Sequence, residues 1–226
     1  MTKLWRSHET DVTGASGMDA AGLARLSLLA AAMLGMATLC LRVLDTELET
    51  VSLSHRSIDL EEGEALLASR APPSMMLAGA TALDRASKPA LSLAEDLTRS
   101  SLRRQPQQPF AWAQLADVRT RLKGNPDTVA LEALQHSIGQ CRYCNRELLR
   151  WRLTFALNHW DSIPESLRLE IFEGAEFLRW WHLDGAFLAE ARETAEARNI
   201  PFADYQQKVL TNLQPYEVEA WQPEQG

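Results

Sequence analysis

Apolar residues follow two different patterns along this chain. From Leu26 to Leu41 they run without a charge, and Arg25 and Arg42 close the run. Farther along, apolar positions recur every three or four residues between polar ones, and no long alternating run of the kind that a half-buried strand requires is present. The two patterns predict an all-α chain, with one continuous apolar helix followed by a set of amphipathic helices.

The uncharged run is close to the length of a membrane span. Its 16 residues would extend about 24 Å as a helix, against a hydrocarbon core of about 30 Å. Residues 20–23 lengthen it on one side and residues 43–44 on the other, provided that the two flanking arginines reach back to the headgroups. We therefore predict a transmembrane signal anchor over 23–44. The alternative is a buried helix of a soluble protein.

The charges that flank the run predict its orientation. Lys3, Arg6 and Arg25 precede it, whereas Arg42 and Arg56 follow it. Because basic residues accumulate on the cytoplasmic side, we expect residues 1–22 in the cytoplasm and the remainder in the periplasm of a single-pass inner-membrane protein.

Removal of the anchor is not expected. Signal peptidase requires small residues around the cut, and the segment Ala37–Leu39 fails at its last position. The residue before a lipidated cysteine is normally small, but Leu39 precedes Cys40. Cys40 is instead suited to a lipid-facing helix as a small apolar residue.

Capping residues and breakers divide the rest of the chain. Residues 45–73 are predicted to form a juxtamembrane connector that contains one short helix, capped by Asp59, and a helical domain is predicted over 74–213. Its helices are expected to begin after Ser74, at Pro89, near Trp112, near Ala130, near 146, after Pro164, after Gly185 and near 203. Residues 214–226 are predicted to be a flexible tail.

The helix after Pro164 shows the clearest apolar stripe. Its members are spaced by three or four residues and are Leu167, Ile171, Ala175, Leu178 and Trp181. Aromatic residues at this spacing usually belong to a core, although tryptophans near carboxylates can also stack on sugars. We expect the tryptophans of the later helices, Trp181 among them, to be mainly core residues.

The chain also repeats itself. Four pairs of small or apolar residues are each separated by 36 positions: Ala94/Ala130, Leu97/Ala133, Ser101/Ser137 and Leu102/Ile138. A period in the mid-thirties, with small residues where two helices cross closely, is typical of helix–turn–helix repeats.

These residues resemble the tetratricopeptide (TPR) family. Its pattern places an aromatic residue and a Leu–small pair in the first helix, small residues in the second and a proline at the end of the unit. The matching positions here are Trp112, Leu115, Ala116, Gly124, Ala130 and Pro106, whereas Arg119 stands where the pattern prefers Tyr. The likeness covers about residues 90–140 and implies a TPR-like solenoid or bundle that binds partners in a groove between first helices, near Trp112 and Arg119.

A wider likeness suggests the biological setting. The anchor, the connector and the segments QPFAWAQLADVR and LLRWRLTFALNHWDSIPESLR resemble small TPR-like proteins of bacterial exopolysaccharide assembly systems. This resemblance implies a scaffold or assembly factor whose partners are other envelope or inner-membrane proteins. It implies no catalytic residues.

Cys141 and Cys144 form the sharpest local motif, a CxxC pair. Outside the cytoplasm such a pair favours a structural disulfide, and inert thiols are a second interpretation. A thiol–disulfide oxidoreductase is the alternative function, although the strand-then-helix context of thioredoxin-like sites is absent. No second CxxC is present to complete a zinc site, and no Ser/His/Asp order, P-loop or GxGxxG motif stands out. We expect no metal or cofactor and no enzymatic activity.

Charge is unevenly distributed along the chain, which is −7 overall. Residues 99–152 carry 10 basic and 4 acidic groups (net +6), between flanks of net −6 (43–98) and −8 (153–226). A basic segment between acidic flanks argues against a nucleic-acid binder, but it allows internal docking of opposite charges or an anion-binding face. Arg142, Arg146 and Arg150 form a stripe that could bind an acidic partner or an anionic glycan, or could be a solvated helix face.

Overall fold

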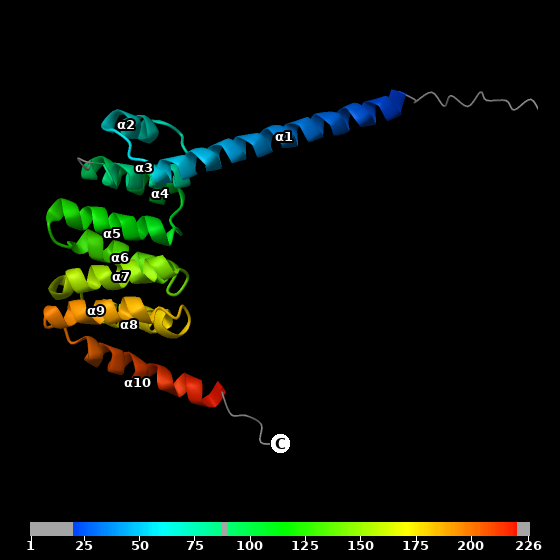
Figure 1. Ribbon diagram of the computed structural model, residues 1–226. Coiled ribbons are helices and arrows are strands. Elements are labelled where there is room, and N and C mark those ends of the chain that lie inside the picture. The colour runs from blue at the N-terminus through cyan, green and yellow to red at the C-terminus, as the bar shows by residue number, and fades with distance from the viewer. Residues whose placement is uncertain (1–19, 87–89, 221–226) are drawn as a thin grey trace, which may run out of the picture. The chain divides into compact units, whose positions relative to one another are not determined.

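All regular elements in residues 20–86 and 90–220, the part of the chain that this computed structural model describes, are helices (Figure 1). The helices are α1 (Ala20–His55), α2 (Leu60–Ala68), α3 (Pro73–Asp84), α4 (Leu91–Arg104), α5 (Pro109–Lys123), α6 (Thr128–Gln140), α7 (Arg146–Asn158), the 3-10 turn η1 (Trp160–Ser162), α8 (Glu165–Trp180), α9 (Gly185–Ala197) and α10 (Phe202–Ala220). The chain divides into two compact units, residues 1–47 and 48–226. The all-α prediction is confirmed.

The apolar run lies within α1. From Ser27 to His55 this helix is long and apolar enough to cross a membrane. The large apolar side chains between Leu28 and Val51, among them Met33 and Leu41, are more than half exposed. These side chains are therefore not covered by the described part of the protein, as a buried core helix of a soluble protein would require.

The first part of the expected connector is helical, which corrects the sequence-based boundary. α1 continues to His55 because the segment 45–55 contains no glycine or proline to stop it. Leu53 is buried in the second unit. The chain then turns, and the side chain of Asp59 accepts from the Glu62 N–H at 2.9 Å, which caps α2 as predicted.

Other helix ends differ from the prediction by a few residues. α3 begins at Pro73, without a side-chain cap, rather than after Ser74, because proline suits the first helical position. Pro89 lies outside the described residues, and α4 begins at Leu91. α10 continues to Ala220, so the helix enters the segment expected as a flexible tail, of which residues 221–226 are not described.

The second unit is built from helical hairpins at a nearly constant interval. α3, α5, α7 and α9 begin at residues 73, 109, 146 and 185, and α4, α6, α8 and α10 begin at 91, 128, 165 and 202. Within the first three pairs the two helices pack together, and α10 packs mainly on α8. The first helices also contact one another in the order α3, α5, α7 and α9. The repeat that the sequence showed over 36 residues thus extends along the whole stack.

Two equivalent hydrogen bonds explain part of that repeat. The Ser101 hydroxyl on α4 donates to the Pro73 carbonyl at the start of α3, and the Ser137 hydroxyl on α6 donates to the Pro109 carbonyl at the start of α5, both at 2.8 Å. Both serines are buried. A buried hydroxyl needs a hydrogen-bond partner. Each serine therefore connects the second helix of its hairpin to the first turn of the first helix.

Candidate functional site

The first helices of three successive hairpins line one groove. α5 contacts α3 on one side and α7 on the other. The hollow has a volume of about 740 Å³, and the Phe110 ring in it is 40% exposed. Its lining is Ser74, Leu77, Ala78, Thr81, Asp84 and Arg85 from α3, Gln108, Phe110, Ala113, Gln114 and Asp117 from α5 and its N-cap, and Glu147, Leu148 and Trp151 from α7.

The groove is formed by equivalent positions of the repeat. On α5, the lining residues recur at three- and four-residue steps, which places them on one helix face. The matching residues of α3 stand 36 positions earlier, in the pairs Ser74/Phe110, Leu77/Ala113, Ala78/Gln114 and Thr81/Asp117. The same face of α3 and of α5 is therefore turned toward the hollow.

Polar groups in the groove are arranged around Asp117. Burial raises the pKa of Asp117, and the neighbouring Asp84 carboxylate raises it further. Arg121 contacts Asp84 and lies 3.7 Å from Asp117, so one guanidinium pairs with two carboxylates. Glu147 adds a third, exposed carboxylate on α7. The groove therefore offers apolar surface together with an acidic centre.

Trp112 and Arg119 do not line this groove. The Trp112 indole donates to the Pro106 carbonyl at 2.7 Å, and its ring stacks on His136 at 4.5 Å. Arg119 is paired with Asp127 at 2.8 Å and with Glu95 at 3.5 Å. Both side chains connect α5 to neighbouring segments of the stack, so their place in the structure is that of internal contacts.

The arginine stripe of α7 is also engaged inside the domain. Arg146 and Arg150 each make two hydrogen bonds to the carboxylate of Asp184, which is 3% exposed and precedes α9. These bonds, those from Arg150 most of all, hold the pKa of Asp184 well below its usual range. Arg142 pairs with Glu173 at 3.0 Å and Glu170 at 3.4 Å. The basic middle of the chain is thus docked onto acidic residues of the following segment.

Cys141 and Cys144 are joined by a disulfide in the loop between α6 and α7, with Cα atoms 5.6 Å apart. Cys141 is the C-cap of α6, and its backbone N–H donates to the Ser137 carbonyl. The loop is held by Arg152, which is 2% exposed and donates to the carbonyls of Cys141 (2.9 Å), Arg142 (3.2 Å) and Ser137. Burial lowers the pKa of Arg152 to about 10, so it is charged at neutral pH.

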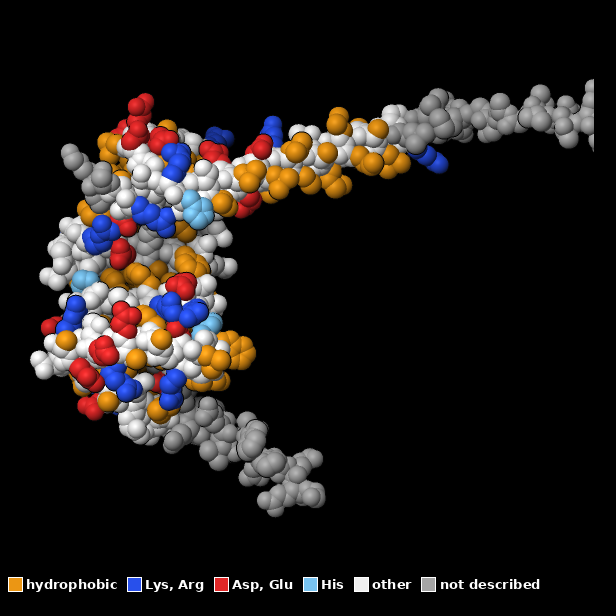
Figure 2. Space-filling model, viewed as in Figure 1, with side chains coloured by type: hydrophobic (Ala, Val, Ile, Leu, Met, Phe, Trp, Pro, Cys, Tyr) orange, Lys and Arg blue, Asp and Glu red, His pale blue; other side chains and the backbone are white. Residues whose placement is uncertain are grey.

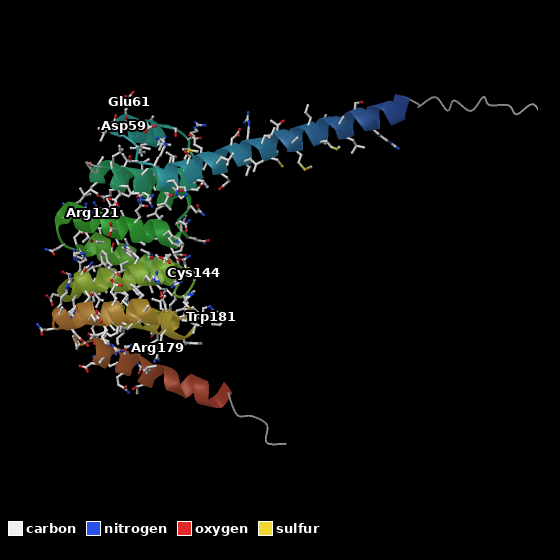
Figure 3. All side chains as sticks on the ribbon, viewed as in Figure 1. Asp59, Glu61, Arg121, Cys144, Arg179 and Trp181 are labelled. Carbon is white, nitrogen blue, oxygen red and sulfur yellow. A yellow bond between two sulfur atoms is a disulfide. The ribbon has the colours of Figure 1, made fainter. Side chains whose placement is uncertain are left out.

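One apolar surface lies outside the groove. Trp181 was expected in the buried stripe of α8, but that helix ends at Trp180 and the side chain of Trp181 is 65% exposed. Phe177 stacks on Trp181 (ring centroids 5.7 Å apart) and on Tyr143 (5.0 Å). We call the set Tyr143, Phe177, Trp180, Trp181 and Leu183 the aromatic patch. Figure 3 shows Trp181 and Cys144 at the same edge of the domain.

Neither a metal site in the described part of the chain nor a known relative indicates which reaction or ligand the site serves. Among the described residues, no group of three or more His, Cys, Asp and Glu side chains is placed to hold a metal ion. No protein-family model, curated protein or solved structure matches the chain. Any function must therefore be argued from the groove, the apolar helix and the exposed surface.

Sequence reasoning missed Phe110, Asp117 and Asp184. The first two could have been found by extending the 36-residue period back to α3, because they match Ser74 and Thr81. Asp184 carried no such signal, since it stands in a short Leu-Asp-Gly turn far from the arginines that it binds.

Proposed function

We propose that this protein is a membrane-anchored helical interaction module, acting as a scaffold or assembly factor in a cell-envelope pathway. Its partners would be other envelope or inner-membrane proteins, and exopolysaccharide synthesis or export is the pathway that the family resemblance favours. A periplasmic location of the helical domain is part of the proposal. The observation that carries it is the groove along α3, α5 and α7, in a chain that also has an apolar helix of membrane-spanning length.

The groove supports a binding role better than a catalytic one. Its surface combines the open Phe110 ring and the half-buried Leu77 and Trp151 with amide and carboxylate groups. Aromatic anchors beside a few placed polar groups are typical of sites that bind peptide segments. The groove runs across three helices, with repeat-equivalent positions on α3 and α5, which suits an elongated ligand such as a segment of another protein, as in a TPR-like solenoid.

The anionic-glycan and oxidoreductase alternatives have less support. Arg142, Arg146 and Arg150 already pair with carboxylates of the same chain, so an anionic ligand would have to displace them. Cys141 and Cys144 lie in a loop between two helices, α6 and α7, rather than in the strand-then-helix context of thioredoxin-like sites.

Site-specific photocrosslinking in cells tests the groove. A photoreactive amino acid in place of Phe110 is expected to give a discrete adduct with one envelope protein. The matched control is Leu122 on the same helix, which is 38% exposed but does not line the groove. No adduct at 110, or the same adducts at 110 and 122, would contradict the assignment. Trp112 and Arg119 are unsuitable test positions because their loss would disturb the packing of α5.

A C-terminal reporter fusion tests the orientation separately. Alkaline phosphatase is active only after export, so a fusion behind residue 226 is expected to be active, and a green fluorescent protein that folds only in the cytoplasm is expected to stay dark. The opposite pair of results would place the helical domain in the cytoplasm.

A further inference from the structure

The aromatic patch exposes an unusual amount of apolar surface. Trp180, Trp181 and Leu183 are 54%, 65% and 82% exposed, and Tyr143 is 37% exposed. Figure 2 shows a hydrophobic bulge at the edge of the domain where Figure 3 labels Trp181. Neither indole N–H of these two tryptophans donates a hydrogen bond within the described residues. Contiguous apolar surface of this kind marks an interaction site.

Leu183 gives an independent sign that the patch contacts something. Its φ is 51°, in the left-handed region that leucine rarely adopts. The other non-glycine residue at positive φ in the described chain is Asn199, at 57°, and asparagine tolerates this conformation. Both the backbone conformation and the exposure at 183 favour asparagine or glycine over leucine. The apolar side chain is thus unfavourable for the folded domain alone, which points to a role in binding.

Only a short length of chain separates the predicted span from the start of the helical domain. The span is predicted to end at residue 44, and the second unit begins at Leu48. Along a helix, Leu53, its first buried residue, lies about 14 Å beyond residue 44. Each headgroup layer is about 5–8 Å thick. Leu53, near the start of the second unit, is therefore expected within a short distance of the lipid headgroups.

We propose that the aromatic patch is a membrane-contact surface that inserts Trp180, Trp181 and Leu183 into the headgroup region of the bilayer that holds the anchor. Tryptophan suits this occupant, because its ring is apolar and its free N–H can bond to headgroups or water. The basic residues beside the patch are already neutralised, Arg142 by Glu173 and Arg179 by Glu176. Contact is thus apolar and requires no anionic lipid. The inference rests on the proposed membrane anchoring.

Fluorescence quenching in lipid nanodiscs tests the contact with the full chain. The nanodiscs contain phosphatidylcholine with bromine on the acyl chains near the headgroup, which quenches nearby tryptophans. The emission that Trp180→Phe/Trp181→Phe removes belongs to the patch, and we expect most of it to be quenched in the wild-type chain. Replacing a third of the lipid with phosphatidylglycerol that is brominated at the same acyl positions is expected to leave the quenching unchanged.

Leu183→Asn separates binding from folding. It removes the apolar side chain and relieves the backbone, so the variant is expected to melt at the same or a higher temperature and to lose most of the patch quenching. Leu122→Asn, at another exposed leucine, is expected to retain it. Patch emission that is unquenched, or quenched equally in Leu183→Asn, would overturn the inference, as would loss of a dimer as the only effect of Leu183→Asn. Failure of the chain to enter nanodiscs would instead refute the anchor itself.

Discussion

Removing the charge of the Asp184 carboxylate is expected to destabilise the helical domain strongly. It stands at the N-cap of α9 and receives hydrogen bonds from Arg146 at 2.9 and 3.0 Å and from Arg150 at 2.5 and 2.7 Å. Its side chain is 3% exposed. These bonds connect α7 to the turn between α8 and α9. The substitution Asp184→Asn keeps the shape of the side chain but removes the charge that both arginines neutralise.

The expected cost follows from the environments of the three side chains. Breaking a buried ion pair commonly costs about 3–5 kcal/mol, because a charge is left without its partner. Here the two arginines are 46% and 29% exposed, so water can solvate them in the variant, and we expect the low end, about 3 kcal/mol. At about 2–4 °C per kcal/mol for a domain of this size, Tm should fall by about 6–12 °C.

Thermal unfolding of the full chain in detergent, followed by circular dichroism at neutral pH, measures this effect. Glu173→Gln is the matched control: it removes an ion pair with Arg142, whose side chain is 45% exposed. Exposed pairs contribute about 0–1 kcal/mol, so the control should lose far less. A decrease for Asp184→Asn below about 2 °C, or no larger than that of the control, would refute the reasoning.

The pH dependence provides a second reading of the same site. The folded-state pKa of Asp184 lies below its unfolded value of about 3.9. The charged form is thus bound more favourably in the folded state, so the contribution to stability is complete well above about pH 4 and is lost as the pH falls further. The wild-type chain should therefore lose more Tm between pH 6 and pH 3 than Asp184→Asn, and parallel curves would contradict the assignment.

Three further changes test the framework around the groove. Arg152→Met should cost about 3 kcal/mol in a denaturant titration, because the carbonyls of Ser137, Cys141 and Arg142 lose their donor; an unchanged midpoint would exclude a stabilising role for these hydrogen bonds. Replacing both Cys141 and Cys144 by Ser should cost at most about 2 kcal/mol, since the closed loop is short, and should leave crosslinking at Phe110 intact; loss of the adduct would instead link the disulfide to function. Gly124→Ala should cost about 1 kcal/mol in the same titration, because φ is +80° at this C-cap, and a stabilised variant would contradict that backbone argument.

Local signals were sufficient to predict the helical class and most element positions. The Asp59 capping box and the proline at the start of α5 act within one helical turn, so they can be read directly from neighbouring residues. Boundaries failed where a signal was weak: the segment 45–55 has no breaker, and α1 simply continues to His55. The prediction that Trp181 is buried was wrong for a related reason. The apolar stripe indicates which face of the helix is buried, but not the residue at which α8 ends.

The repeat was the most informative non-local signal. The repeat predicts Ser101 and Ser137 as small residues at a helix crossing. In the structure each is buried and its hydroxyl donates a hydrogen bond to the first turn of its own hairpin. Groove residues also follow this period, because Phe110 and Asp117 stand 36 residues after Ser74 and Thr81. Only the stacking of α3, α5 and α7 shows that these faces meet, since periodicity alone does not say which side of a helix remains uncovered.

The roles of charged and aromatic residues are harder to predict from sequence, because they depend on contacts with residues far away in the chain. A stripe of arginines at four-residue spacing has the same pattern whether it binds a ligand or a carboxylate of its own chain, and here Asp184, some 34 positions after Arg150, decides between the two. Conversely, Trp181 has the spacing of a core residue but lies on the surface. Once the internal ion pairs are assigned, the surfaces that remain open in the described chain include the groove, with its exposed Phe110 ring, and the aromatic patch. Under the proposed function, the groove would hold a partner and the aromatic patch would contact the bilayer, and the two can be disrupted separately by changes at Phe110 and Leu183.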